Sequence, residues 1–119
     1  MDFKQGEILL LPFPFDDLSG AKKRPVLVIS SDDFNRISRT IIVVEITSNL
    51  HSGFRELNVQ IEDKDVKRYP NTKPLIPSLI KPYVIFSVSK RLVQKRIGIL
   101  REEKLKEVFS VLEKIFEGL

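Results

Sequence analysis

Two uninterrupted runs of aliphatic and β-branched residues constrain the fold of this chain more than any other feature. One run extends from Arg24 to Ser30 and the other from Thr40 to Thr47. Branched side chains favour extended backbone, because they pack well on a pleated surface. A continuous apolar run bounded by turn residues is typical of a strand that is buried on both faces. We therefore predict two buried strands.

Weaker patterns predict three further strands around these two. The chain from Gly6 to Leu11 is expected to be extended, and the loop that follows, from Pro12 to Gly20, is rich in turn residues. Apolar and polar residues alternate from Leu57 to Ile61, which is typical of a half-buried strand. The segment from Pro70 to Pro82 is proline-rich and expected to be irregular. A strand from Tyr83 to Val88 is then expected to start at the last of these prolines.

The last segment changes to a helical period. Apolar residues between Arg101 and Glu117 follow a spacing of three and four, which places them on one helical face. Many short strands and one closing amphipathic helix predict a mainly β fold with a C-terminal helix, similar to a small SH3-like barrel. A chain of 119 residues fits one domain, residues 1–119, that can bury a core without covalent staples.

The composition excludes several kinds of chemistry. The chain has no cysteine and one histidine, His51, so zinc thiolate sites and a pair of catalytic imidazoles are excluded. The acidic residues lack the spacing of known metal-binding loops, and the isolated glycines offer no loop for a nucleotide phosphate. We expect no metal and no cofactor. The chain has no apolar run long enough for a signal peptide or membrane span, so we expect a soluble, cytoplasmic protein.

Basic residues are concentrated in one third of the chain. The net charge is only +4, but no acidic residue lies between Val66 and Arg101, a segment rich in lysine and arginine. If this block folds onto one face, it will attract a polyanion such as nucleic acid. The alternative is a solvated surface that happens to be basic.

Chemistry that takes its nucleophile from the substrate remains open. RNA carries a 2′-hydroxyl beside each phosphodiester, and an enzyme cleaves it by holding that group in line and stabilising the developing charge. Arg24 ends the basic run that starts at Lys22, and Thr47 ends the next predicted strand. If the two strands are antiparallel neighbours, these side chains converge. The alternative is an exposed arginine and a threonine that merely end their strands.

At these residues the sequence resembles the MazF/PemK family of toxins from type II toxin–antitoxin systems. The most specific matches are Arg-Pro-Val-Leu-Val-Ile and Ile-Thr-Ser. The matching pieces span nearly the whole chain and are, in order, Gly6–Leu10, Leu18–Gly20, Lys23–Ile29, Ile46–Ser48, Pro77–Lys81, Ser87–Leu92 and Arg96–Leu100.

The resemblance implies a MazF/PemK/CcdB-like barrel and a metal-independent endoribonuclease. Such a toxin cuts single-stranded RNA at a short sequence, acts as a homodimer and is neutralised by an antitoxin protein. The family's catalytic arginine and threonine fall on Arg24 and Thr47, and its loop serine and later strand serine fall on Ser19 and Ser78. The candidate RNA-binding residues are Ser19, Lys22, Lys23, Ser48, Ser78, Lys81 and Lys90.

The sequence also departs from the family pattern after Lys81. Pro82-Tyr83-Val84 stands where relatives carry an acidic or amide residue, so we expect a polar contact of the family to be lost there. Two other functions remain open. One is a non-catalytic member of the barrel family that binds a protein, as gyrase poisons do, and the other is an RNA-binding barrel that stacks bases on aromatic side chains.

Overall fold

The computed structural model describes residues 2–12 and 23–117 of the chain. In these residues the strands form one antiparallel, seven-stranded sheet in the order β4-β6-β3-β2-β1-β7-β5. The strands are β1 (Glu7–Pro12), β2 (Lys23–Val28), β3 (Thr40–Thr47), β4 (Val59–Ile61), β5 (Val66–Arg68), β6 (Ser78–Ser89) and β7 (Lys95–Leu100). The helices are α1 (Asp32–Ile37) and α2 (Glu102–Phe116), with 3₁₀ turns η1 (Arg55–Leu57), η2 (Asp63–Asp65) and η3 (Lys90–Leu92).

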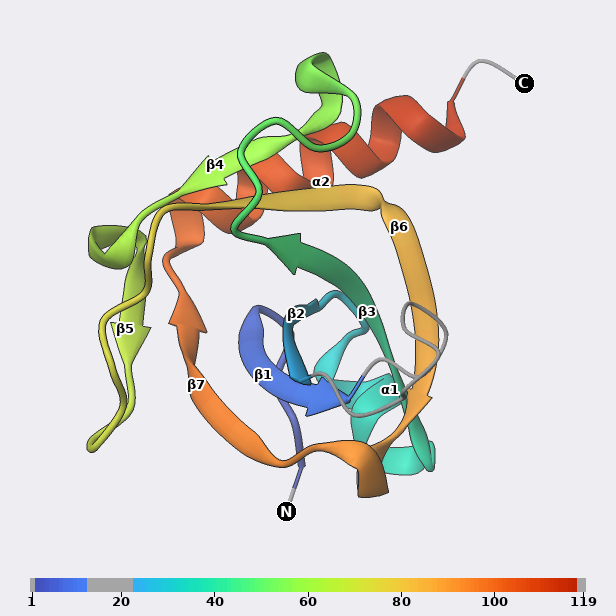
Figure 1. Ribbon diagram of the computed structural model, residues 1–119. Coiled ribbons are helices and arrows are strands. Elements are labelled where there is room, and N and C mark those ends of the chain that lie inside the picture. The colour runs from blue at the N-terminus through green and yellow to red at the C-terminus, as the bar shows by residue number, and fades with distance from the viewer. Residues whose placement is uncertain (1, 13–22, 118–119) are drawn as a thin grey trace.

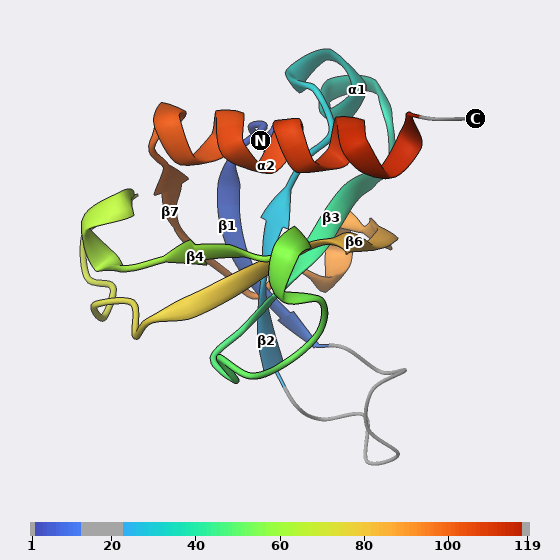
Figure 2. The ribbon, with the colours of Figure 1, turned by 90° about the horizontal axis from the view of Figure 1, so that it is seen from above.

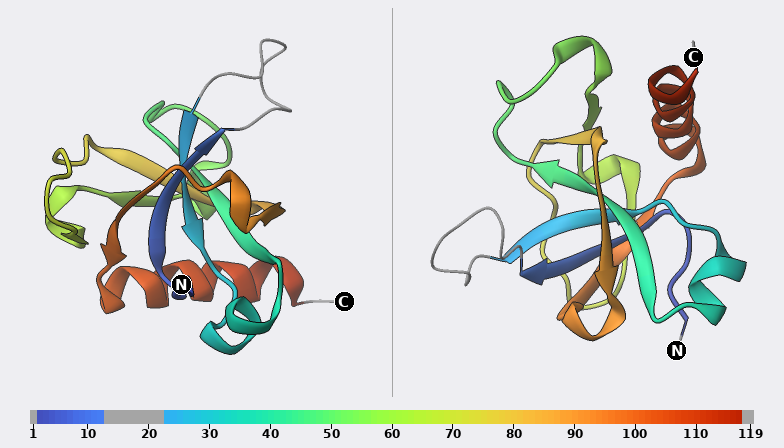
Figure 3. Two further views of the ribbon diagram at one scale, coloured as in Figure 1. Left: turned by 90° about the horizontal axis from the view of Figure 1, so that it is seen from below. Right: turned by 90° about the vertical axis from the view of Figure 1, so that its right-hand side faces the viewer.

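The sheet curls strongly, so that β7 and β6 lie on opposite sides of a ring around β1, β2 and β3 (Figure 1). Helix α2 lies across one side of this curled sheet, next to β4 (Figure 2). The end of β3, the start of β2 and the loop from β3 to β4 lie on the other side, away from α2 (Figures 2 and 3). The expected fold class, a mainly β barrel-like sheet with a C-terminal helix, is confirmed.

Two hydrophobic clusters use opposite faces of the central strands. Leu27, Val44 and Ile46 belong to the cluster that packs against α2. Val26 and Val28 belong to the second cluster, with side chains from β1, β3 and the N-terminal segment. All three apolar residues of β2 from Val26 to Val28 are completely buried. The prediction of a strand buried on both faces is therefore confirmed for β2.

The expected strand start at Pro82 is wrong. Strand β6 runs without interruption from Ser78 to Ser89, with Pro82 in its first half. The register explains why proline is tolerated there. Lys81 lies opposite Glu45, but the next pair along β3 joins Val44 to Ile85, so residues 82–84 are skipped. The missing N–H of Pro82 therefore costs no hydrogen bond of this ladder.

Strands β5 and β7 and helix α1 are not predicted from the sequence. Helix α1 begins after Ser31, whose hydroxyl accepts a hydrogen bond of 3.1 Å from the Phe34 N–H. In β7, Gly98 breaks the run of larger residues that marks a strand. A Cβ at Gly98 would lie 2.5 Å from the Lys67 carbonyl oxygen, so glycine lets β5 approach β7 closely.

A fully buried carboxylate connects the N-terminal segment to β7 and to the chain after β5. Glu7 is 0% exposed, and its Oε1 accepts a hydrogen bond of 3.0 Å from the Lys4 N–H. Its Oε2 accepts bonds from the Tyr69 hydroxyl (3.1 Å) and from Arg96 Nη1 (3.3 Å). The Arg96 guanidinium also lies 4.2 Å from the centroid of the Phe3 ring. The charge of Glu7 is thus compensated where water cannot reach it.

Burial raises the pKa of Tyr69 to about 12 from 10.0, and the negative charge of Glu7 and the hydrogen bond to it act in the same direction. Because the folded-state pKa is the higher one, the stabilising effect is complete below pH 10 and is lost as the pH rises toward 12. We therefore expect the free energy of unfolding of the wild type to fall more steeply over this range than that of Tyr69→Phe. Denaturant titrations of both proteins at several pH values test this. Parallel pH profiles would contradict it.

Candidate functional site

Arg24 and Thr47 lie at neighbouring strand ends. Strands β2 and β3 are antiparallel, and Val26 lies opposite Glu45 in the last pair of their ladder. Arg24 and Thr47 each lie two residues beyond this last pair, on the same side of it. The condition for convergence, antiparallel pairing of β2 with β3, is therefore met, and the convergence of the two side chains stays a prediction.

The two side chains are held differently. Arg24 is half-buried and its Nε atom is buried, so the guanidinium lies partly within the protein surface. Thr47 is also half-buried, and its hydroxyl oxygen accepts a hydrogen bond of 3.1 Å from the Asn49 N–H. The hydroxyl proton of Thr47 is not used in that bond. A cation and a hydroxyl donor thus lie at two neighbouring strand ends.

Lys81 is placed by an internal ion pair. Its Nζ lies 3.2 Å from a carboxylate oxygen of Glu45, its cross-strand partner, and the two side chains are 14% and 12% exposed. The same Nζ donates a hydrogen bond of 2.8 Å to the Ser52 hydroxyl. At such low exposure the two charges need each other. Lys81 therefore neutralises Glu45 beside Thr47 rather than adding a net positive charge there.

A hollow of about 700 Å³ lies between the loop from β3 to β4, the strands β4 and β6, and α2. Leu79 of β6, which lines it, is the cross-strand partner of Thr47. The hollow is also lined by the loop that begins directly after Thr47. His51 also lines it, exposed, with its N–H donating to Asn49 Oδ1. The lining residues are Leu50, His51, Ser52, Gly53, Arg55, Asn58, Gln60, Leu79, Lys104 and Glu107.

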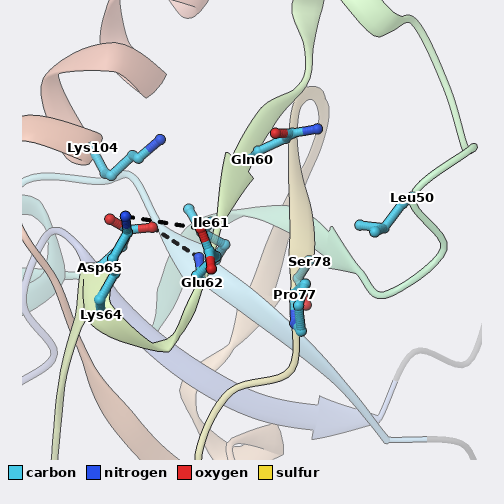
Figure 4. Close-up of a pocket in the computed structure, with 9 residues that line it drawn as sticks. All are labelled: Leu50, Gln60, Ile61, Glu62, Lys64, Asp65, Pro77, Ser78 and Lys104. Carbon is cyan, nitrogen blue, oxygen red and sulfur yellow. Dashed lines mark hydrogen bonds and ion pairs between the residues drawn. The ribbon is translucent and has the colours of Figure 1, made fainter.

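A second hollow of about 330 Å³ adjoins the first and shares Leu50, Gln60 and Lys104 with it (Figure 4). Its walls carry both signs of charge, because Lys64 and Lys104 lie there with Glu62 and Asp65. Ser78 lines this hollow but is 3% exposed, and its hydroxyl donates to the Ile76 carbonyl oxygen at 2.8 Å. In this conformation the Ser78 hydroxyl is directed to the protein's own backbone.

The other predicted RNA-binding residues do not all lie near Arg24 and Thr47. Lys23 is exposed next to Arg24, and Ser48 is exposed next to Thr47. Ser19 and Lys22 lie outside the described residues. Lys90 follows Ser89, which pairs with Thr40 at the other end of β3, roughly 23 Å from Thr47 at about 3.3 Å per residue.

The basic block from Val66 to Arg101 does not form one surface. Lys67 and Arg68 lie on β5 at one end of the sheet order, whereas Lys81 lies on β6 near the other end. Several members also have acidic partners. Arg68 lies 2.9 Å from Asp63, and Lys81 and Arg96 pair with Glu45 and Glu7. The folded chain thus separates and partly neutralises a charge pattern that is continuous in the sequence.

Two side chains near the candidate site were not identified from the sequence. Glu45 was counted as part of a buried strand, and Tyr83 as an ordinary strand residue. Glu45 pairs with Lys81, and the Tyr83 hydroxyl donates to Asn58 Oδ1 at 2.7 Å. No local pattern marks either residue, because their partners are far away in the sequence. Within residues 2–12 and 23–117, no cluster of His, Cys, Asp or Glu is placed to hold a metal ion, and no helix is long and apolar enough to cross a membrane.

The fold is shared with solved structures of other proteins. Three similar solved structures are an endoribonuclease in complex with its cognate antitoxin from Mycobacterial species, the MazE–MazF complex (Form-II) of Deinococcus radiodurans and the Mycobacterium tuberculosis toxin MazF-mt6. Identity to the first is 17%, with a TM-score of 0.70, covering 94% of this chain and 92% of that one. Identity to the second is 17%, with a TM-score of 0.71, covering 100% of this chain and 99% of that one. Identity to the third is 16%, with a TM-score of 0.70, covering 93% of this chain and 96% of that one.

These likenesses establish the fold. The family itself follows from the sequence, because the family model described as PemK-like, MazF-like toxin of type II toxin–antitoxin system matches residues 4–116. The chain therefore belongs to the PemK-like, MazF-like toxins of type II toxin–antitoxin systems.

Proposed function

We propose that this toxin-family chain is an endoribonuclease that cuts single-stranded RNA at a short recognition sequence without a metal. The observation that supports this best is the antiparallel pairing of β2 with β3, in which Arg24 and Thr47 each lie two residues beyond the Val26–Glu45 pair. The loop that follows Thr47 lines a hollow of about 700 Å³, which is large enough to receive part of an RNA strand. Similar structures that bear the name endoribonuclease support the same class of activity.

The reaction is an attack of the substrate's own 2′-oxygen on the adjacent phosphorus. The O2′–P bond forms and the P–O5′ bond breaks, while a proton leaves O2′ and another is taken up by O5′. The guanidinium of Arg24 donates to the non-bridging oxygens, where negative charge develops. The Thr47 hydroxyl donates to the same phosphate and holds it in line. The residues so far described thus supply charge stabilisation and positioning.

The partners follow from the same proposal. The chain acts as a homodimer on RNA and is inhibited by a cognate antitoxin. Similar structures include complexes of such toxins with an antitoxin. An acidic, partly disordered antitoxin segment would compete with RNA for the surface that carries Arg24 and Lys23, because both ligands are polyanions.

Cleavage should leave a 2′,3′-cyclic phosphate and a 5′-hydroxyl, because the nucleophile is the 2′-oxygen. It should continue in EDTA, because no metal takes part in the proposed step. A long unstructured RNA incubated with purified protein, followed by chemical mapping of both new ends, tests this. Ends with a 5′-phosphate, or loss of cleavage in EDTA, would refute the mechanism. Intact RNA would favour a toxin that acts by binding another protein.

Arg24→Ala should lower the rate of cleavage by at least ~10²-fold, the scale for losing one pre-organised donor to a developing charge. Thr47→Ala should cost less, about 10-fold, because a neutral hydroxyl contributes a weaker hydrogen bond. Thr47→Ser keeps the hydroxyl and serves as its matched control, with a rate close to that of the wild type. Single-turnover rates at saturating protein measure these effects. Equal rates for Arg24→Ala and the wild type would show that Arg24 takes no part in the reaction.

RNA binding near Arg24 should depend on salt through Lys23. Loss of one phosphate contact changes the slope of log K against log salt by about 0.7 for single strands, so Lys23→Ala should flatten the slope by about that amount. Lys90→Ala removes the same charge at the far end of β3 and is the matched control, with an unchanged slope. Fluorescence titrations of a non-cleavable RNA at several salt concentrations measure both. A flatter slope only for Lys90→Ala would place the RNA on the other end of the sheet.

A further inference from the structure

The hydroxyl of Tyr83 joins two parts of the loop between β3 and β4. It accepts a hydrogen bond of 2.7 Å from the Phe54 N–H and donates one of 2.7 Å to Asn58 Oδ1. The Tyr83 and Phe54 rings also pack together, with centroids 5.0 Å apart and planes at 59°. Tyr83 is able to reach the loop because it lies within residues 82–84, which the β3–β6 register skips. Tyr83, which has no partner in the β3–β6 ladder, thus forms hydrogen bonds to the loop.

Lys81 provides a second attachment two residues earlier on the same strand. Its Nζ donates to the Ser52 hydroxyl at 2.8 Å and pairs with Glu45 on β3. Asn58, which accepts from Tyr83, donates through Nδ2 to the Ser52 carbonyl oxygen at 2.8 Å. The contacts therefore form a connected network rather than separate bonds. We call Lys81, Tyr83 and Asn58 the loop clamp.

Gly53 is the residue that lets the loop lie against the clamp. Its φ is +72°, a conformation that side chains with a Cβ rarely adopt. A Cβ at this position would lie 1.8 Å from the Tyr83 hydroxyl oxygen and 2.9 Å from Lys81 Cε. The close approach and the backbone conformation both require glycine. The loop is thus fitted to Tyr83 by its sequence as well as by its hydrogen bonds.

We infer that Tyr83 is a positioning residue that fixes residues 48–54 as a preformed wall of the hollow beside Thr47, and thereby helps to determine which RNA sequences are cut. The inference rests on the proposed function. The wall residues His51, Ser52 and Gly53 line the hollow, and so does Leu79, the cross-strand partner of Thr47. The clamped loop begins at the residue after Thr47, so a nucleotide next to a phosphate bound at Thr47 meets this loop.

The clamp acts through the conformational entropy of the loop. A loop that is already ordered loses little freedom when RNA binds, whereas a loose loop must be ordered by the RNA at the expense of affinity. A fixed wall also excludes nucleotides that a mobile wall would accommodate. Arg24 and Thr47 belong to strands of the sheet, and the loop contact of the Thr47 hydroxyl comes from the Asn49 N–H rather than from the clamp residues. Loss of the clamp should therefore change KM and sequence preference much more than kcat.

Tyr83→Phe removes both hydrogen bonds with little change in shape, and Tyr69→Phe, the other tyrosine, is the matched control because its hydroxyl bonds to Glu7. In Tyr83→Phe we expect amide exchange of residues 49–54 to be faster by about 5- to 30-fold, the scale of one or two hydrogen bonds. We expect KM to rise at least about 5-fold, kcat to stay within about twofold, and new cut sites to appear on a long RNA. Tyr69→Phe should show none of these changes.

A double-mutant cycle tests the contact itself. Gly53→Ala should loosen the loop more in the wild-type background than in Tyr83→Phe, because the nearest atom to the new methyl group is the Tyr83 hydroxyl oxygen. The backbone strain at Gly53 is the same in both backgrounds and cancels in the cycle. Additive effects on amide exchange would show that Tyr83 and Gly53 do not act together.

The outcomes separate the two proposals. If the wild type does not cleave RNA, the proposed function fails, and the assigned role in sequence preference fails with it. If Tyr83→Phe leaves amide exchange of the loop and the set of cut sites unchanged in an active enzyme, the clamp is refuted while the endoribonuclease activity stands. Faster exchange of the loop together with an unchanged set of cut sites would reduce Tyr83 to a purely structural residue.

Discussion

The pairing of β2 with β3 is the constraint on which the rest of this structure depends. Val26, Leu27 and Val28 are completely buried, and they alternate between two hydrophobic clusters on opposite faces of the sheet. A slip of one residue would turn every β2 side chain to the opposite face of the sheet and disrupt the packing of both clusters. The register is therefore strongly specified, and the relation between Arg24 and Thr47 is specified with it. Core packing, rather than a local active-site motif, fixes the strand pairing from which these two residues extend.

The sequence predicts those elements whose signal is local. The strands β2 and β3 and helix α2 are encoded by continuous apolar runs or by a strong helical period, so their positions are predicted to within one or two residues. Strands β5 and β7 were missed because their short or glycine-interrupted runs form strands only when they pair with each other. Strand β6 was shortened in the prediction, because proline usually ends a strand. The three-residue skip that tolerates Pro82 depends on β3, about forty residues away along the chain.

The candidate site divides in the same way. Arg24 and Thr47 are found from strand ends and family motifs, whereas the Glu45–Lys81 pair and the contacts of Tyr83 depend on tertiary structure. This changes the meaning of the segment after Lys81. In the sequence, Pro82-Tyr83-Val84 indicates the loss of a polar contact. In the structure, Tyr83 supplies polar contacts of its own, to Phe54 and Asn58. The basic block from Val66 to Arg101 shows the opposite relation. Its residues are continuous in the sequence, but in the structure they lie on different strands and partly pair with acidic residues.

The two edges of the sheet have a consequence for how the chain folds. Edge strands β4 and β5 contain three residues each and follow one another in the sequence, with only η2 between them. One short turn therefore joins both ends of the sheet. At the same time, the ladder between β1 and β7 joins Glu7 to Ile99, nearly the whole length of the chain. Contacts of such high sequence separation slow the search for the native topology. Short edge strands offer few unpaired backbone groups to other chains while the sheet forms. This topology therefore combines slow folding with a low tendency to aggregate.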